Sequence, residues 1–284
     1  MNPTAQLWNI VNINGNLNAI KANCENCQSL DDITRQLPDG AYTTLRTYNH
    51  WQALHLDNHF FRLEETCKLA GFDLHLDQNQ MRLCLRSVLQ ELSEIEDLRL
   101  RISIDLTSEK GSIYISAEAL TVPPAEAYVA GVNVITKTMH RDNPKAKMTG
   151  FLKSTSEIRR EMTAGVNEGL MISPDGRILE GLSSNFFAVK NNTLYTEEKD
   201  VLSGITRSIV FEVAEELNIS LVKEGIRVDE IDGITEAFIT STSRLVLPVK
   251  QIDDTKIGQK MPGVFTEKIM SAFQEKITDA LEVN

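Results

Sequence analysis

The chain has 284 residues, which at a typical ~150 residues per domain predicts one large or two ordinary domains, and two is the expectation. Hydrophobic residues make up 42% and charged residues 24%, which excludes the disordered, collagen-like and disulfide-framework classes of protein. The net charge of −11 gives nucleic acids and anionic membranes no general electrostatic reason to bind. Neither is expected as a partner.

The N-terminal sequence and the cysteine content favour a cytoplasmic protein. Residues 1–8 lack the basic start and apolar stretch of a leader, and no run of ~18 apolar residues follows. Four cysteines are too few for a disulfide-based secreted fold. Cys24 and Cys27 form a C-x-x-C pair without a second pair at zinc-ribbon spacing, so neither a metal site nor a redox role is expected. Cys67 and Cys84 are expected to be small core residues.

In the first half of the chain, the spacing of apolar residues predicts two helices and then two strands. The helices are expected at 57–69 and 78–92, and the strands at 98–105 and 112–116, joined as a hairpin. The pair Pro123-Pro124 breaks the pattern because proline donates no backbone N–H and fixes φ. We therefore predict a small α+β domain over 1–122, a linker over 123–130 and a larger domain over 131–284.

Beyond the linker, the pattern predicts many short strands and few helices. This distribution argues against repeated βαβ units, which need a helix between each pair of parallel strands. The larger domain is therefore expected to be barrel-like, and the whole chain to be a two-domain α+β protein. Helices are expected at 154–162, 205–217 and 265–281, and strands at 132–136, 169–172, 178–180, 186–189, 193–195, 219–222, 236–240 and 245–249.

Two segments have the chemistry of a phosphate-binding site. The stretch Leu202 to Arg207 puts Gly204 and Thr206 at a helix start, where unpaired N–H groups and the helix dipole favour an anion. An ordinary helix start has the same residues. The run Thr240 to Ser243 offers four consecutive hydroxyls between two apolar strands, although a serine/threonine turn also fits.

Three charged residues stand out in the rest of the chain. Arg62 lies in the first predicted helix, Lys147 in a mixed segment, and Glu180 in an apolar alternation that would bury it. The ordinary interpretation of each is a solvated side chain. A buried glutamate, however, needs a partner.

In order and spacing these features resemble the class IV aminotransferases, the fold-type IV family of pyridoxal-phosphate enzymes, over about residues 40–264. His59 to Leu63 resembles the family helix whose arginine binds the cofactor phosphate. Lys147 matches the family's Schiff-base lysine. Glu180 matches the glutamate that faces the pyridine nitrogen, and Leu202 to Arg207 resembles the phosphate-binding helix start.

The resemblance implies a role for each of these residues. Lys147 would be both the covalent tether and the base that moves the Cα proton, and Glu180 would keep the ring nitrogen protonated. Pyridoxal 5'-phosphate would lie between a small domain and a barrel-like domain, as in D-amino acid aminotransferase-like folds, usually in a homodimer. The implied phosphate and ring contacts are Arg62, Leu202, Gly204, Ile205, Thr206, Ser241 and Thr242.

On the substrate side the resemblance is mixed. Arg46 and Tyr48 resemble the branched-chain aminotransferase pattern, whereas Thr43-Thr44 resembles the aminodeoxychorismate lyase branch. The hydroxyl run at 240–243 is similar to that of the transaminases. We therefore predict amino transfer between a branched-chain or other apolar L-amino acid and 2-oxoglutarate, with 4-amino-4-deoxychorismate lyase and D-amino acid aminotransferase as alternatives. The substrate contacts expected are Tyr42, Arg46, Tyr48 and Ser243, with Arg101 as a further candidate.

Two points of the resemblance leave alternatives open. Gly150 stands near the place where the family usually has an asparagine, so Lys145 and Lys153 are fallbacks for the reactive lysine. A binding protein that keeps the fold without the cofactor is disfavoured, because all five cofactor positions are present.

Overall fold

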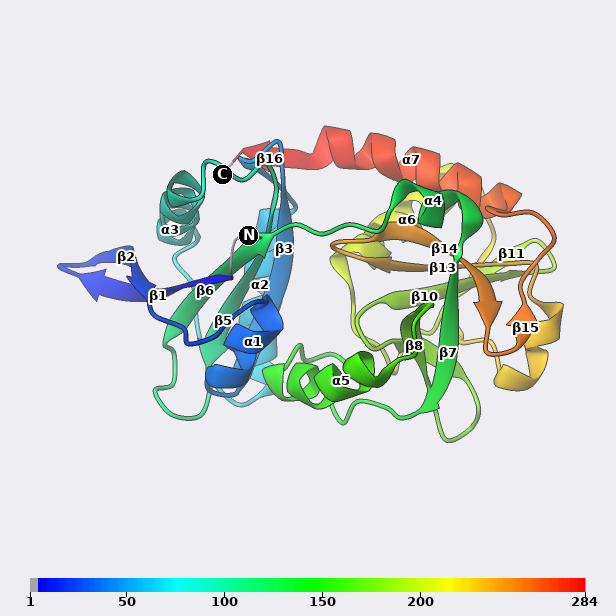
Figure 1. The fold of residues 1–284 in the computed structure, drawn as a ribbon, viewed down its shortest axis with the longest axis horizontal. Coiled ribbons are helices and arrows are strands. Elements are labelled where there is room, and N and C mark those ends of the chain that lie inside the picture. Colours follow the sequence, from blue (N-terminus) through cyan, green and yellow to red (C-terminus); the bar gives the residue numbers. More distant parts are fainter. Residues whose placement is uncertain (1–4, 284) are drawn as a thin grey trace. The chain divides into compact units, whose positions relative to one another are not determined.

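The computed structural model describes residues 5–283, which pack as two compact units (Figure 1). Of these residues, 5–121, 146–156 and 280–283 form unit 1, and 122–145 and 157–279 form unit 2. By its contacts the segment that carries Lys147 therefore belongs with unit 1, although the expected boundary assigned it to the larger domain. The domain boundaries themselves stay a prediction. No helix within 5–283 is long and apolar enough to cross a membrane.

Unit 1 is built on a seven-stranded antiparallel sheet with the strand order β16-β4-β3-β5-β6-β1-β2. The predicted hairpin is present as β5 and β6. The other five strands do not show in the periodicity of the sequence, and two strands of the sheet, β3 and β5, carry the polar residues discussed below. The strands are β1 (Gln6–Ile13), β2 (Asn16–Ala22), β3 (Gly40–Tyr48), β4 (Gln52–Leu54), β5 (Leu98–Asp105), β6 (Ile113–Ala119) and β16 (Leu281–Val283).

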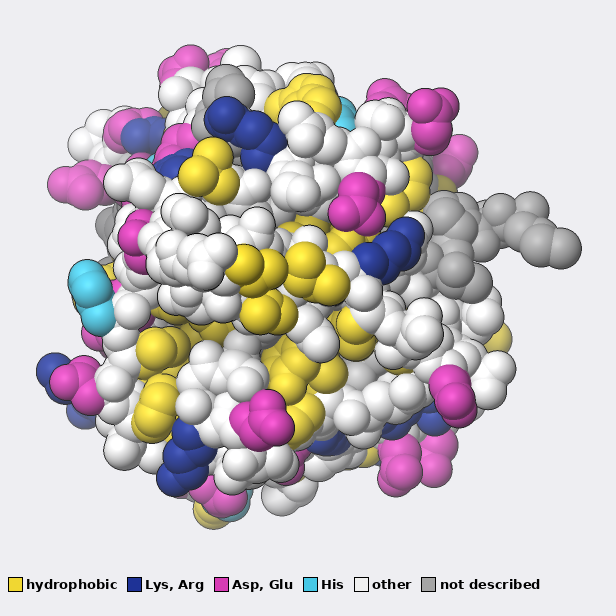
Figure 2. All heavy atoms as spheres, turned by 90° about the vertical axis from the view of Figure 1, so that its left-hand side faces the viewer, with side chains coloured by type: hydrophobic (Ala, Val, Ile, Leu, Met, Phe, Trp, Pro, Cys, Tyr) yellow, Lys and Arg dark blue, Asp and Glu magenta, His cyan; other side chains and the backbone are white. Residues whose placement is uncertain are grey.

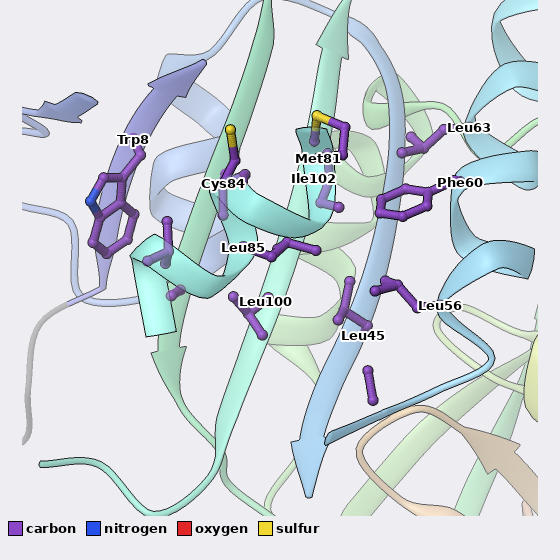
Figure 3. Packing of buried hydrophobic residues seen from close by; sticks show 14 of the residues in the cluster. Trp8, Leu45, Leu56, Phe60, Leu63, Met81, Cys84, Leu85, Leu100 and Ile102 are labelled. Atoms are coloured by element: carbon purple, nitrogen blue, oxygen red, sulfur yellow. The ribbon is translucent and has the colours of Figure 1, made fainter. Parts of the chain in front are cut away.

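Helices α2 (Leu56–Leu69) and α3 (Gln78–Glu91) provide the apolar side chains that pack with one face of this sheet (Figure 3). Alternation along the strands places Leu45 and Leu100 in this core, together with Phe60 of α2 and Met81 of α3. Burial of each such side chain contributes about 1.5–3 kcal/mol to folding. The short helix α1 (Leu30–Gln36) is capped by Ser29, whose hydroxyl accepts the N–H of Asp32.

The β1–β2 hairpin leaves hydrophobic side chains in solvent. Val11, Ile13 and Ile20 are exposed there, as is Leu83 of α3. Figure 2, which views the molecule from the hairpin side of Figure 1, shows hydrophobic side chains grouped among polar ones on this face. An exposed group of this kind is typical of surfaces that contact another protein.

The four cysteines have two different states. A disulfide joins Cys24 and Cys27 in the connection between β2 and α1, a bond not expected from the sequence. Cys67 and Cys84 are free and buried, which confirms their assignment to the core.

Six strands of unit 2 close into a barrel, which confirms the barrel-like architecture. The pairing runs β10-β13-β14-β7-β8-β9, and β9 pairs back to β10. Strands β11, β12 and β15 extend this sheet, and the barrel interior is apolar. The strands are β7 (Val132–Thr138), β8 (Val166–Ile172), β9 (Ile178–Gly181), β10 (Asn185–Lys190), β11 (Thr193–Tyr195), β12 (Leu221–Val222), β13 (Glu236–Ser241), β14 (Leu245–Ile252) and β15 (Thr255–Lys256).

The remaining helices are α4 (Ala125–Ala130), which lies within the predicted linker, α5 (Thr149–Glu161), α6 (Ile205–Glu216), η1 (Val228–Gly233) and α7 (Val264–Ala280). The predicted start of α5 at residue 154 was wrong by five residues. Thr149 and Gly150 have low helix propensity, so the first turn does not show in the sequence pattern. In the structure, the Thr149 hydroxyl accepts the backbone N–H of Gly40 at 2.8 Å, which stabilises that turn.

Candidate cofactor site

Lys147 of unit 1 is held by backbone pairing with β3. The N–H of Tyr42 donates to the Lys147 carbonyl at 2.9 Å, and Ala41 and Met148 form a β-bridge. The Lys147 N–H donates to the hydroxyl of Thr66 at 3.3 Å. Its Nζ lies 4.7 Å from the centroid of the Tyr42 ring. The backbone therefore places the lysine amine over an aromatic face.

Arg62, Thr43 and His59 form a chain of hydrogen bonds beside this lysine. Arg62 Nη2 donates to Thr43 Oγ1 at 2.6 Å, and that oxygen lies 2.7 Å from His59 Nδ1. Burial, together with the charges of Arg62, Lys147 and His55, lowers the pKa of His59 well below 6.5. The imidazole is therefore neutral, and the Thr43 hydroxyl accepts from Arg62 while lying within hydrogen-bond distance of His59 Nδ1.

Arg62 also has donor capacity for a ligand. Burial lowers the pKa of Arg62 to about 10, and its Nε is buried without a hydrogen-bond partner among the described residues. A buried guanidinium with an unused donor is stabilised by an anion, and the oxygens of a phosphate match the geometry of its N–H groups. This orphan donor is the observation in unit 1 that fits a cofactor phosphate.

The predicted substrate residues of β3 share one face of the strand. Tyr42, Arg46 and Tyr48 alternate with core residues, and the Arg46 guanidinium lies 4.4 Å from the Tyr48 ring centroid. Arg46 also pairs with Asp97, with Nη2 3.6 Å from Oδ2. Burial raises the pKa of Tyr48 to about 12, so the phenol stays neutral. The face thus offers two aromatic rings and a cation.

Arg101 and the two fallback lysines have other roles in the structure. The buried Arg101 donates to the Leu30 carbonyl and to Asp31, both at 3.0 Å, and so anchors α1. Lys145 Nζ donates to the Glu198 carbonyl at 2.5 Å, and Lys153 Nζ pairs with Asp39 at 2.7 Å. Of the three candidate lysines, Lys147 is the one whose amine lies over Tyr42.

In unit 2, Glu180 is 2% exposed and is surrounded by donors. Its Oε1 accepts from Arg141 Nε at 2.8 Å and from the Leu202 N–H at 3.3 Å, and its Oε2 accepts from Asn185 Nδ2 at 3.0 Å. The ion pair and these hydrogen bonds stabilise the carboxylate form. A buried Glu180 predicts a partner, but the sequence does not single out Arg141, because nothing in the residues around Arg141 distinguishes it from a surface arginine.

The predicted phosphate-binding helix start is the N-terminus of α6. A Cβ atom at Gly204 would lie 2.2 Å from Asn185 Oδ1, so this position requires glycine. Asn185 also donates to the Leu202 carbonyl at 3.0 Å. No side chain within residues 5–283 caps α6, which leaves the first-turn N–H groups of Ile205 and Thr206 for an anion.

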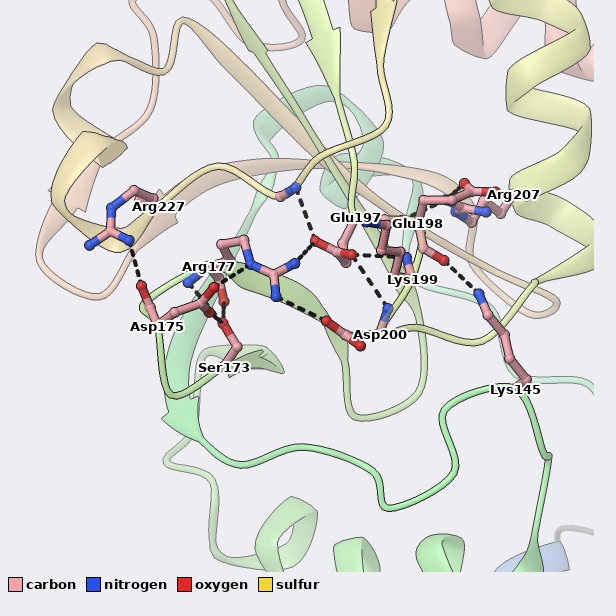
Figure 4. Close-up of polar contacts among 11 residues, drawn as sticks. Lys145, Ser173, Asp175, Arg177, Glu197, Glu198, Lys199, Asp200, Arg207 and Arg227 are labelled. Atoms are coloured by element: carbon pink, nitrogen blue, oxygen red, sulfur yellow. Dashed lines mark hydrogen bonds and ion pairs between the residues drawn. The ribbon is translucent and has the colours of Figure 1, made fainter.

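An arginine network holds the stretch that leads into α6 (Figure 4). Arg177 donates to Glu197 and, at 2.9 Å, to Asp200. Arg207, in the first turns of α6, donates to the Glu197 carbonyl and to the Glu198 carboxylate, both at 2.6 Å. These contacts fix the chain on both sides of residues 202–206.

The hydroxyl run lies at the end of β13. Thr240 pairs with Asn185 of β10 in the barrel, and its Oγ1 is buried without a hydrogen-bond partner in the described part of the chain. Ser241 accepts from Arg244 Nε at 3.0 Å. Thr242 and Ser243 are partly exposed. Unit 2 therefore combines a buried carboxylate, an uncapped helix start and a hydroxyl run, which suit the ring nitrogen and the phosphate of pyridoxal phosphate.

The comparison with known proteins points to the same family as these residues. Residues 40–252 match the family model described as amino-transferase class IV. The chain is 30% identical over 273 residues to a D-alanine aminotransferase of Bacillus licheniformis, covering 87% of this chain and 91% of the relative. It is 26% identical over 265 residues to a branched-chain-amino-acid aminotransferase of Pseudomonas aeruginosa, covering 86% of each chain.

Solved structures share the fold. A putative branched-chain amino acid aminotransferase from Thermotoga maritima superposes with a TM-score of 0.77 at 24% identity, covering 97% of this chain and 96% of that one. The pyridoxal-phosphate-bound form of a hypothetical aminotransferase from Mycobacterium tuberculosis gives 0.75 at 18% identity, covering 97% and 99%. The resemblance predicted from the motifs is confirmed: the chain belongs to the class IV aminotransferases, a family of pyridoxal-phosphate-dependent transaminases.

Proposed function

We propose that this transaminase moves an amino group between a branched-chain or other apolar L-amino acid and 2-oxoglutarate. The observation that carries the proposal is the shared face of Tyr42, Arg46 and Tyr48 on β3. Two rings suit an apolar side chain, and a guanidinium suits the anionic side chain of the second substrate. The relative named as a branched-chain aminotransferase also supports it.

Lys147 and Glu180 would perform the proton chemistry. Pyridoxal phosphate, when bound, supplies the electron sink that stabilises negative charge at the substrate Cα. The Nζ of Lys147 would tether the cofactor and, once released, would take the proton from the substrate Cα and deliver it to the former aldehyde carbon of the cofactor, with the reverse transfer in the second half-reaction. Glu180, held as a carboxylate by Arg141 and Asn185, keeps a proton on the ring nitrogen.

The remaining residues would bind the cofactor and the substrate. Arg62 supplies a buried guanidinium for the phosphate, and Gly204 lets the α6 start pass close to Asn185. Leu202 packs against the ring. The other proposed phosphate ligands are the amides of Ile205 and Thr206 and the hydroxyls of Ser241 and Thr242, and Ser243 is proposed to contact the substrate with the β3 residues.

A D-amino acid aminotransferase is the second candidate, because the relative with 30% identity is named D-alanine aminotransferase. Initial rates with 2-oxoglutarate and a panel of L-leucine, L-valine, L-isoleucine and D-alanine separate the two, with the chirality of the glutamate product as a second readout. The proposal predicts L-glutamate from the branched-chain donors. Turnover of D-alanine with formation of D-glutamate would replace it with the second candidate.

The aminodeoxychorismate lyase alternative rested on Thr43-Thr44. In the structure Thr43 bridges Arg62 and His59, a role that needs no lyase substrate. Release of pyruvate from aminodeoxychorismate without any 2-oxo acid acceptor would nevertheless establish the lyase.

A homodimer and a cytoplasmic location belong to the same proposal. The exposed hydrophobic residues of the β1–β2 hairpin support contact with a second chain, and the low cysteine count supports the location. Light scattering coupled to gel filtration tests the first point, because a monomer at micromolar concentration would contradict it.

A further inference from the structure

Arg244, which follows the hydroxyl run, connects three parts of unit 2. Its Nε donates to Ser241 Oγ at 3.0 Å, and its Nη2 donates to Ser183 Oγ at 2.7 Å and to Glu168 Oε2 at 2.8 Å. Its own carbonyl accepts from the Tyr128 hydroxyl at 3.0 Å. One guanidinium therefore links the hydroxyl run with the turn that follows Glu180 on β9.

Glu168 is a rigid anchor for this guanidinium. It is 1% exposed and also accepts from the hydroxyls of Ser183 at 2.8 Å and Ser184 at 2.9 Å. Burial raises the pKa of Glu168, but the charge of Arg244 and these hydrogen bonds outweigh burial and lower it below the ordinary value. A Cβ atom at Gly181 would lie 2.8 Å from Glu168 Cγ, so the Glu168 side chain packs directly against this glycine.

The direction of the hydrogen bonds determines what Ser241 can do. A guanidinium only donates, so Ser241 accepts from Arg244, and its own proton must go to another acceptor. Ser183 shows the contrast: it accepts from Arg244 and donates to Glu168. For Ser241 the described residues provide no such acceptor. The arrangement leaves one hydroxyl proton of the run for an external anion.

The backbone next to Arg244 is strained. Leu245 has φ of 51°, in the left-handed region that a leucine rarely adopts. Such a conformation persists only where surrounding contacts hold it. The contacts of Arg244 with Glu168 and Tyr128 supply that support.

We propose that Arg244 is a positioning residue for the cofactor phosphate. Anchored on Glu168, it holds Ser241 so that the serine hydroxyl donates a hydrogen bond to the phosphate. The inference rests on the proposed function, in which the hydroxyl run binds that phosphate. It goes beyond the proposed function by assigning a role to Arg244 and Glu168, which that proposal does not use.

The test compares the binding of pyridoxal phosphate with that of pyridoxal, which lacks the phosphate, to the apo form of the full chain. Arg244→Lys keeps a cation beside Glu168 but loses the Nε donor to Ser241. We expect it to weaken pyridoxal phosphate binding by about tenfold, the size of one charge-assisted hydrogen bond, and to leave pyridoxal binding unchanged. Ser241→Ala should have the same effect, and the ³¹P resonance of the bound cofactor should move in both variants.

A double-mutant cycle makes the test specific. If Arg244 acts through Ser241, Arg244→Lys has no further effect on the ratio of the two affinities in a Ser241→Ala background. Arg227→Lys is the matched control, because Arg227 pairs with Asp229 on the surface of unit 2. It should change neither affinity.

Each alternative outcome is distinguishable. Equal losses of pyridoxal phosphate and pyridoxal affinity in Arg244→Lys, or fully additive effects in the double variant, would overturn the positioning role. A parent protein that binds the two compounds equally well would instead overturn the phosphate site of the proposed function. Arg244→Met serves as a second variant, and a loss of melting temperature without a change in the affinity ratio would reduce Arg244 to a structural residue.

Discussion

Arg141 Nε lies 2.8 Å from Glu180 Oε1, and both side chains are buried in unit 2. The pair explains how an acidic residue can stay charged inside a barrel wall, since Asn185 and the Leu202 amide complete its hydrogen bonds. A carboxylate held in this way can keep a proton on a pyridine nitrogen without giving up its own charge.

Glu180→Gln should therefore retain cofactor but lose most of its activity, because a neutral amide cannot hold the ring nitrogen protonated. The variant also removes the negative charge that pairs with the buried Arg141, which should lower the free energy of unfolding by about 3–5 kcal/mol. Rates are measured well below the melting temperature of the variant. A rate within about threefold of the parent, less than ~1 kcal/mol in the barrier, would contradict this role.

Lys147→Ala should abolish the visible absorption band of the bound cofactor and nearly all turnover, because the tether and the base vanish together. Circular dichroism should show an unchanged fold. Lys145→Ala and Lys153→Ala are the controls, since their amines contact Glu198 and Asp39. A visible band that persists in Lys147→Ala and disappears in either control would move the assignment.

His59 predicts a pH dependence of the stability of the apo protein. Its pKa is lowered by burial and by neighbouring cations, so below the ordinary value of 6.5 the unfolded chain binds a proton that the folded chain does not. The contribution of neutral His59 to the free energy of unfolding is complete above pH 6.5. It is lost as the pH falls below that value, by about 1.4 kcal/mol per pH unit. In denaturant titrations, His59→Asn should lose less unfolding free energy between pH 7.5 and pH 5.5 than the parent protein does. If the parent and the variant lose the same amount, His59 is protonated in the folded protein.

Gly204→Ala should lower the melting temperature and weaken cofactor binding, because the new Cβ would lie 2.2 Å from Asn185 Oδ1 and displace the α6 start. Gly150→Ala is the matched control. It lies in α5 with nothing closer than 4.0 Å to the added atom, and alanine has the higher helix propensity, so it should be neutral or stabilising. If the two variants had the same melting temperature, the close approach at Gly204 would not hold.

The parts of the fold that the sequence predicted are those with clear periodicity. β5 alternates strictly, and α2 and α3 present apolar residues at helical spacing, so their bounds came out within two residues. β3 does not show in the periodicity because Ala41, Tyr42 and Thr43 are all buried, so apolar and polar residues do not alternate at its start. β1 and β2 form a hairpin that exposes apolar residues, which hides its pattern in the same way.

In the candidate site, too, some residues could be predicted from the sequence and others could not. Arg62, Lys147 and Glu180 belong to motifs and were identified. Arg141 and Arg244 act through contacts with residues 39 and 76 positions away in the chain, and a contact of that range leaves no local mark. The demand of a buried glutamate for a cation was the one available signal. It indicated that a partner exists without saying which.

Amino transfer from an apolar L-amino acid to 2-oxoglutarate is best followed by absorbance, one half-reaction at a time. L-leucine, L-valine or L-isoleucine alone should remove the visible band of the bound cofactor, and 2-oxoglutarate added afterwards should restore it. If none of the three amino acids removes the band, while D-alanine does so or aminodeoxychorismate yields pyruvate catalytically, the claim is wrong.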